Sequence, residues 1–418
     1  MTTSTGPSIA ARVFRAVQDH LSPPLALATK LAGRGAVEVA AADVWVSMSD
    51  GRRLLDFGSY AVTLLGHRHP AVVAAVCEQL QVMPTATRSM GNPTHATAAT
   101  ALVDYFAGAF PRVHFGLNGA DAVEVAVKLA RVRTGRPRVL AVTGSFHGKS
   151  LGALALTHHA AFRAGLPDAL PPTTFVPADD PEGVARELHR GDVAAVVFEP
   201  IQGENGVRPL DPAVLRRWCD DVHRAGGYAI ADEIQTGLHR CGGRSVAREW
   251  GLEIDAVLLG KPLGGGVVPV SAMLCTDDLY RPMATDPFLH TATFGGHPLC
   301  TAAVPATLAV MASCQPRGDR LAALLSAALS ELRDTYPDLV VAVRGKGLLW
   351  GLDFANPELA GEIMLSLLQN GLIVSPCLSR PSSLRLLPPL VAEPEHVERA
   401  MDLLSRSIRD AGRLIRNR

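Results

Sequence analysis

A lysine and an aspartate each follow a short apolar run within residues 227–266. Tyr228–Ala231 is followed by Asp232, and Ala256–Leu259 is followed, after one glycine, by Lys261. Such runs, set between turn-rich segments, are typical of parallel strands, whose carboxyl ends meet at the ligand-binding edge of a sheet. A lysine there can form an imine with an aldehyde, and a buried carboxylate can keep a ring nitrogen protonated. This predicts a pyridoxal phosphate site; the alternative is two loop-end charges, solvated or paired with each other.

Three other loops offer residues that suit such a cofactor. The turn Asn118–Gly119–Ala120 joins a predicted strand to a predicted helix that begins at Asp121, and the free N–H groups of a helix start bind anions. Phe146 could lie flat against a planar ring, or it could pack in the core. Thr293 lies in the glycine-rich segment HTATFGGHP, where its hydroxyl suits a phosphate oxygen. Each loop taken alone also fits a connection without a ligand.

Charged residues follow further predicted strands. Glu199 and Glu204 come after the apolar run 194–198 and could act as acid and base, or could hold neighbouring loops. Arg385 could bind a substrate carboxylate through two parallel hydrogen bonds, or be a surface arginine. The segment TGSFHGKS also resembles a P-loop, but that motif needs a glycine where Thr143 stands, which argues against a nucleoside triphosphate site.

Composition narrows the class of protein. The chain has 418 residues, of which 48% are hydrophobic, and a formal net charge of +0, so two or three domains and no nucleic-acid or membrane-surface partner are expected. We find no apolar run of transmembrane length and no signal-peptide core. The 7 cysteines form no CxxC pair, which favours free thiols in a reducing cytoplasm over disulfides or a metal site.

The order of elements predicts an α/β fold. A hairpin is expected around Asp50–Gly51, and strands alternate with helices from residue 112 onward, which indicates a mostly parallel sheet covered on both faces. After residue 300, helices at 300–313 and 318–335 precede short strands and a final helix. We therefore expect residues 1–55 to join a small α+β domain with residues 301–418, and residues 56–300 to form the large domain.

Ten motifs, in order, resemble those of the class III (ornithine/4-aminobutyrate type) pyridoxal-phosphate-dependent aminotransferases. The resemblance runs from about residue 44 to residue 390. The motifs are DGRRLLDF, GHRHP, NGADAVEVAVKLAR, SFHGKSLGAL, EPIQGENG, ADEIQTGLHRCG, LGKPLGGG, TFGGHPL, RGKGLLWG and LRLLPPL. The resemblance implies the fold type I architecture of pyridoxal phosphate enzymes and a homodimer with shared active sites.

The resemblance also implies roles for individual residues. By resemblance, Lys261 is the lysine that holds pyridoxal phosphate and later moves a proton between Cα and C4′. Asp232 is implied to pair with the pyridine nitrogen of the cofactor. The residues implied to surround the ring are Phe146, His147, Ile234 and Gln235. Those implied to hold the phosphate are Asn118, Gly119 and Ala120, with Thr293 acting on the site of the neighbouring subunit.

Departures from the family pattern concern the substrate. Lys149 stands where the ornithine and aminobutyrate enzymes have an arginine that binds a substrate carboxylate, and a lysine cannot form that planar fork. Asn118 replaces the usual serine before the phosphate-binding glycine, and its amide can still donate a hydrogen bond. Tyr60 lies in a segment that varies with substrate. The pair Glu204 and Arg385 matches the family, in which the glutamate neutralises the arginine until an α-carboxylate arrives.

These features predict an aminotransferase that acts on an α-amino acid and a carbonyl acceptor, in specialised metabolism. One alternative is an enzyme that uses the same carbanion chemistry for elimination, replacement or carbon–carbon bond formation. Another is a non-catalytic binding protein of this fold, for which we would expect Lys261 or Asp232 to be missing.

Overall fold

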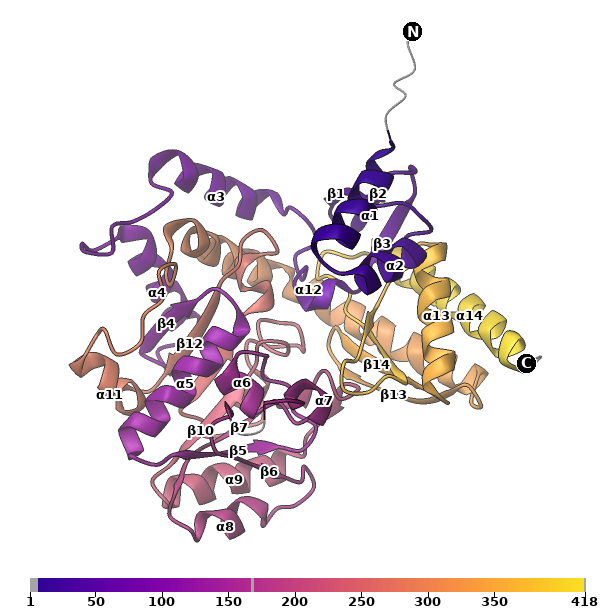
Figure 1. Ribbon diagram of the computed structural model, residues 1–418. Coiled ribbons are helices and arrows are strands. Elements are labelled where there is room, and N and C mark those ends of the chain that lie inside the picture. Colours follow the sequence, from indigo (N-terminus) through magenta and orange to yellow (C-terminus); the bar gives the residue numbers. More distant parts are fainter. Residues whose placement is uncertain (1–6, 167–168, 417–418) are drawn as a thin grey trace.

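The computed structural model describes residues 7–166 and 169–416, and a seven-stranded sheet forms the centre of its larger lobe (Figure 1). Its strands, in spatial order, are β4 (Arg112–Gly116), β12 (Ser271–Cys275), β11 (Ala256–Leu259), β10 (Tyr228–Asp232), β7 (Val193–Phe198), β5 (Arg138–Val142) and β6 (Thr173–Val176). Only β12 runs antiparallel to its neighbours, β11 and β4. The predicted mixed, mostly parallel sheet is therefore confirmed.

Helices cover both faces of this sheet. In sequence order they are α5 (Gly119–Thr134), α6 (Leu151–Ala155), α7 (Ala160–Arg163), α8 (Gly183–Leu188), α9 (Pro212–Arg224), α10 (Val246–Glu249) and α11 (Asp277–Thr285). Side chains alternate across a strand, so Val139 of β5 packs in the same cluster as Val123 of α5, while Leu140 belongs to the cluster of Trp218 of α9. Burial on both faces explains why these strands read as continuous apolar runs.

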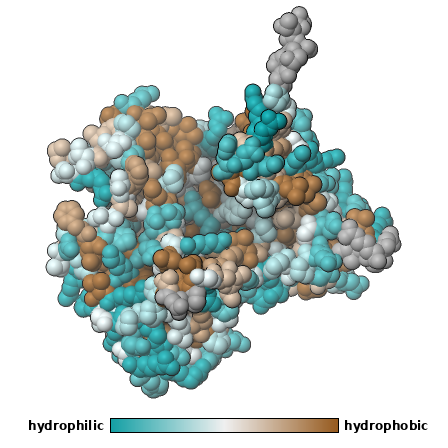
Figure 2. Space-filling model, in the orientation of Figure 1, coloured by the Kyte–Doolittle hydropathy of each residue, from teal (hydrophilic) through white to brown (hydrophobic). Residues whose placement is uncertain are grey.

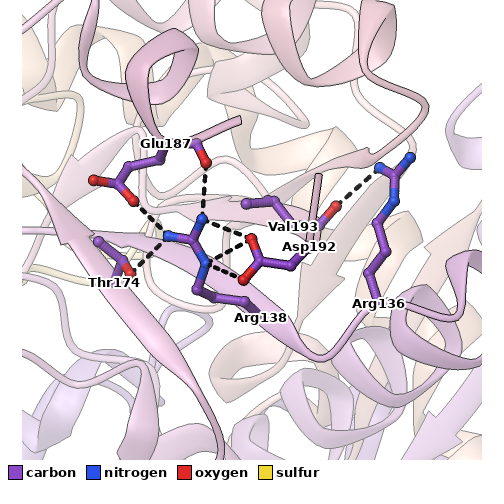
Figure 3. Close-up of polar contacts among 6 residues, drawn as sticks. All are labelled: Arg136, Arg138, Thr174, Glu187, Asp192 and Val193. Atoms are coloured by element: carbon purple, nitrogen blue, oxygen red, sulfur yellow. Dashed lines mark hydrogen bonds and ion pairs between the residues drawn. The ribbon is translucent and has the colours of Figure 1, made fainter. Parts of the chain in front are cut away.

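The amino end of the sheet is fixed by Arg138, the first residue of β5 (Figure 3). Its guanidinium contacts Asp192 at 2.7 Å and Glu187 at 2.5 Å, and it donates to the hydroxyl of Thr174 on β6. A buried arginine is stable only with such partners. The cluster ties β5, β6 and the residue before β7 together at the edge opposite the carboxyl ends of the strands.

The smaller lobe brings the two ends of the chain together (Figure 1). One sheet has the order β1 (Glu38–Ala42), β2 (Trp45–Met48), β3 (Arg53–Asp56) and β15 (Leu372–Ile373), and the other has β13 (Val340–Lys346), β14 (Leu349–Phe354), β17 (Ser383–Leu386) and β16 (Ser375–Pro376). Its helices are α1 (Ile9–His20), α2 (Pro23–Ala32), α13 (Pro357–Asn370) and α14 (Pro394–Arg416). Because β15 pairs with β3, a C-terminal strand completes the N-terminal sheet, which contains the hairpin expected at Asp50–Gly51.

A 38-residue helix, α12 (Pro298–Thr335), runs between the two lobes. It packs against α3 (Pro70–Val82), α4 (Pro93–Tyr105), α14 and β13. The prediction of two helices, 300–313 and 318–335, is wrong: Pro316 lies inside a continuous helix, whose buried leucines anchor both halves. By length and composition α12 could cross a membrane, although 44% of its most apolar window is buried inside the fold. That burial is typical of a core helix.

The remaining short elements connect the lobes to the site. Within residues 7–166 and 169–416 they include a two-stranded sheet of β8 (Ile201–Gln202) and β9 (Arg208–Pro209), and the 3-10 turns η1 (Ser59–Ala61) and η3 (Lys261–Gly264). The η3 turn directly follows β11, so it carries Lys261 past the carboxyl edge of the central sheet.

Candidate functional site

A cavity of about 330 Å³ lies at the carboxyl ends of the central strands. Strand β10 ends at Asp232, β11 leads into Lys261, and the helix α5 begins beside them after β4. Thirteen residues line the cavity: Asn118, Gly119, Ala120, Phe146, His147, Gly148, Lys149, Glu199, Glu204, Asp232, Ile234, Gln235 and Lys261. Five segments that are far apart in the sequence therefore meet here, and Lys261 and Asp232 share one cavity.

The carboxylate of Asp232 is almost fully buried and has two partners. One oxygen lies 2.7 Å from Nδ1 of His147, and the other accepts the backbone N–H of Ile234 at 3.1 Å. Although burial opposes it, the hydrogen bond from His147 to Asp232 raises the pKa of the imidazole. The His147–Asp232 pair therefore holds the carboxylate at the wall of the cavity.

Lys261 opens the η3 turn with a φ of 40°, in the left-handed region that non-glycine residues seldom adopt. Burial lowers the pKa of its amine, and the carboxylates of Glu204 and Asp232 partly oppose that shift. A lowered pKa leaves more of the lysine neutral near pH 7, which is the form that attacks an aldehyde or accepts a proton.

Glu199, which the sequence offered as an acid or base or as a residue that holds neighbouring loops, lines the cavity. Its carboxylate accepts the backbone N–H groups of Phe146, at 2.9 Å, and Gly203, at 3.2 Å, so it joins two of the loops. Burial raises the pKa of Glu199 to about 7. The only sequence signal was a carboxylate at the end of a buried apolar run.

Glu204 and Arg385 form a buried ion pair beside Lys261. The carboxylate oxygen of Glu204 lies 2.7 Å from Nη1 of Arg385, and its other oxygen accepts the backbone N–H of Leu378 at 2.9 Å. Arg385, on β17, also donates to the carbonyl of Pro376 and is 0% exposed. Because Arg385 belongs to the small lobe and Glu204 lines the cavity, the pair connects the small lobe to the cavity of the large lobe.

The residues at the inner end of the cavity fit pyridoxal phosphate. A Cβ on Gly119, the first residue of α5, would lie 2.8 Å from Cδ1 of Ile234, so a side chain here would displace Ile234 at the cavity. Within the described residues, Nε2 of Gln235 and Nε2 of His147 are buried without a hydrogen-bond partner. Four features therefore match four parts of the cofactor. The helix start is an anion site that suits the phosphate, and the two free nitrogens suit the polar substituents of the ring. The carboxylate suits the ring nitrogen, and the lysine suits the aldehyde.

Three predicted site residues do not line this cavity. Arg385 reaches it only through its ion pair with Glu204. Thr293 lines a separate cavity of about 410 Å³, together with Met90 and His95. Tyr60 is 59% exposed and lies in η1, where it has a φ of 51°. Lys149 does line the cavity, and its ammonium nitrogen lies 4.3 Å from the ring centroid of Phe162.

Residues 34–408 match the family model for aminotransferase class-III. Among solved structures, the ornithine aminotransferase from Toxoplasma gondii ME49 has a TM-score of 0.87 and 26% identity, with coverage of 99% of this chain and 100% of that one. The same Toxoplasma enzyme, crystallised with oxidised glutathione and with partial pyridoxal phosphate occupancy, has a TM-score of 0.83 at 26% identity, covering 96% and 98%. A transaminase from the marine bacterium Virgibacillus shares the fold, with a TM-score of 0.85, 18% identity, and coverage of 91% and 94%. The predicted fold type I architecture is confirmed.

Proposed function

Because the chain belongs to the class III aminotransferases, which are pyridoxal-phosphate-dependent and act on amino acids and keto acids, we propose that its own substrate is an α-amino acid bound through Arg385. The observation that carries this proposal is the buried Arg385–Glu204 ion pair beside Lys261. A guanidinium matches a carboxylate through two parallel hydrogen bonds, and Glu204 balances its charge in the absence of substrate.

When bound, pyridoxal phosphate supplies the aldehyde that carries the amino group and a ring that spreads carbanion charge. Lys261 is the residue proposed to hold it and, once freed by the substrate, to move the proton at Cα. Its lowered pKa supports that role because a neutral amine is a better base. Asp232, held by His147, is proposed to keep the ring nitrogen protonated, which favours loss of the Cα proton.

The other proposed contacts follow the lining of the cavity. Asn118, Gly119 and Ala120 would bind the phosphate at the start of α5. Phe146 and Ile234 would enclose the ring, and Gln235 would bond its hydroxyl through the free amide nitrogen. Enclosure also excludes water, which strengthens the electrostatic contacts inside.

Borohydride reduction followed by peptide mapping tests the cofactor lysine: label is expected on Lys261 and is expected to disappear in Lys261→Ala. A spectroscopic screen of amino acids then tests the substrate class, since a true donor converts the cofactor to its pyridoxamine form. Arg385→Ala should abolish this conversion for α-amino acids while leaving the borohydride label in place. Label on another lysine, or unchanged conversion by Arg385→Ala, would contradict the proposal.

A homodimer with shared active sites is part of the proposal. Apolar side chains gather over α3 on the surface (Figure 2), and exposed ones in this region include Leu80, Val82 and Met90. Met90 and Thr293 line the same separate cavity, which supports Thr293 acting on a partner's site. Light scattering should give twice the chain mass. Mixing Lys261→Ala with Thr293→Val chains should restore one intact site per mixed dimer, and no restoration would argue against sharing.

A cytoplasmic location is proposed as well. The structure describes all seven cysteines, and none of them forms a disulfide. Free thiols persist in a reducing compartment. Fractionation of the producing cells tests the location, and recovery outside the cytoplasmic fraction would contradict it. A role in specialised metabolism and biosynthesis stays a prediction.

A further inference from the structure

Phe162, on α7, contacts two residues that line the cofactor cavity without lining it itself. Its ring centroid lies 4.3 Å from the ammonium nitrogen of Lys149. It also lies 6.0 Å from the ring centroid of Phe146, at an interplanar angle of 82°, which is an edge-to-face contact. His159 packs against the same ring at 5.1 Å. Phe162 therefore fixes the relative position of one cation and one aromatic residue at the cavity.

Lys149 has a different kind of partner from Asp232 and Glu204, two other charged residues of the cavity. Asp232 forms an ion pair with His147, and Glu204 forms one with Arg385. By contrast, no carboxylate of the described residues lies within ion-pair distance of Lys149. Its ammonium lies over the face of the Phe162 ring, which attracts a cation through the ring quadrupole. A lysine has a flexible stem, so this ring determines where the charge lies.

We infer that Phe162 is a specificity-determining residue of this enzyme, which holds the Lys149 ammonium over its ring at the cavity mouth. This inference rests on the proposed function, because it assumes that Arg385 binds the α-carboxylate and that the far end of the substrate reaches Lys149. The Phe146 ring gives the cavity wall an apolar part, and the ammonium, held over the face of Phe162, can donate hydrogen bonds. The preferred substrates have an apolar body that ends in a carboxylate or another acceptor, and substrates that end in a second ammonium are rejected.

Two unreactive ligands of equal chain length isolate the contact at the far end. Glutarate carries a carboxylate at both ends, and pentanoate carries one, so the ratio of their dissociation constants for the holoenzyme reports Lys149 alone. Phe162→Leu keeps apolar volume but removes the ring face, and should weaken glutarate binding by roughly 2- to 5-fold relative to pentanoate, the equivalent of an exposed cation–π contact. Phe162→Tyr keeps the ring and should retain the wild-type ratio.

The dependence on Lys149 is tested in a second background. In Lys149→Met, which keeps the stem and removes the charge, Phe162→Leu should cause no further change in the ratio. Phe175→Leu is the matched control, because it removes the ring under Arg163, at 5.0 Å, which does not line the cavity. Its ratio should equal that of the wild type.

The inference is overturned if Phe162→Leu weakens both ligands equally, or if its effect persists in Lys149→Met. Either result would mean that Phe162 only packs against the loop. The binding ratio needs no amino-group transfer, so it can be read even if no amino acid converts the cofactor. If no amino acid converts the cofactor, the proposed function is contradicted. If the ratio of dissociation constants does not change as expected, the specificity role of Phe162 is contradicted.

Discussion

Replacing Glu204 with glutamine should destabilise the ligand-free enzyme and make its stability depend on a carboxylate ligand. Arg385 is 0% exposed, and its charge is balanced by Glu204 at 2.7 Å. Glutamine has nearly the same shape but no charge, so the guanidinium stays buried without a counter-ion. A bound carboxylate would supply that counter-ion. In the wild type the same ligand must first displace Glu204.

The size of the effect follows from the contacts. Removing one partner of a buried ion pair costs about 3–5 kcal/mol. A glutamine oxygen can still accept a hydrogen bond, worth about 1.5–3 kcal/mol when the donor is charged. It can also keep the bond from the backbone N–H of Leu378. The free energy of unfolding should therefore fall by roughly 1–3 kcal/mol.

Urea denaturation of the holoenzyme, with and without pentanoate, measures both parts of this prediction. Ligand at a hundred times its dissociation constant adds about 2.7 kcal/mol of stability. At a fixed pentanoate concentration, Glu204→Gln should therefore gain more than the wild type, because it binds the carboxylate more tightly. Glu182→Gln is the control: Glu182 pairs with Arg217 while half exposed, and its loss should cost less than about 1 kcal/mol. Equal stability of wild type and Glu204→Gln, or equal gains from pentanoate, would refute the reasoning.

Three further predictions concern other residues of the cavity. Lys149→Arg should raise kcat/KM for glutamate or 2-oxoglutarate about tenfold, by adding a charge-assisted hydrogen bond, and unchanged values for every substrate would show that Lys149 faces solvent. Burial raises the pKa of Glu199 from 4.5 to about 7, so the folded enzyme keeps a proton that the unfolded chain has lost, and stability should fall as pH rises across this interval. Glu199→Gln should flatten that decline in denaturation curves at pH 5 and pH 7, and an unchanged slope would exclude Glu199 as its source. Gly203→Ala would place a Cβ 1.2 Å from Oε1 of Gln235, so the dissociation constant of pyridoxal phosphate should rise; unchanged cofactor affinity would mean that Gln235 does not bind it.

The central strands could be predicted closely because burial on both faces leaves an unbroken apolar run. Ala256–Leu259 is β11 in both prediction and structure, and β10 extends the predicted run by one residue, Asp232. The interruption of α12 was predicted wrongly because a proline is a strong local signal against a helix. In the structure, packing along both halves outweighs that local preference.

From the sequence, only the part of the cavity that is formed by the converging ends of the strands could be predicted. Most of the predicted residues line it, because parallel strands place their carboxyl ends at one edge. Thr293 and Tyr60 depend on long loops, whose course no periodicity in the sequence indicates. Phe162 could not be found at all, because its contacts with Phe146 and Lys149 arise from the packing of the short helix α7 against the segment 146–149.

The distribution of charge in the cavity explains where specificity can reside. Two pairs neutralise its interior: His147 with Asp232, and Arg385 with Glu204. In the proposed function, both pairs serve features that every α-amino acid and the cofactor share, so neither would distinguish one amino acid from another. The charge that remains for the variable end of a substrate is Lys149, at the exposed side of the cavity. Because a lysine alone would sample many positions, the ring of Phe162 gives that charge a defined place, and the choice of substrate should follow from this contact.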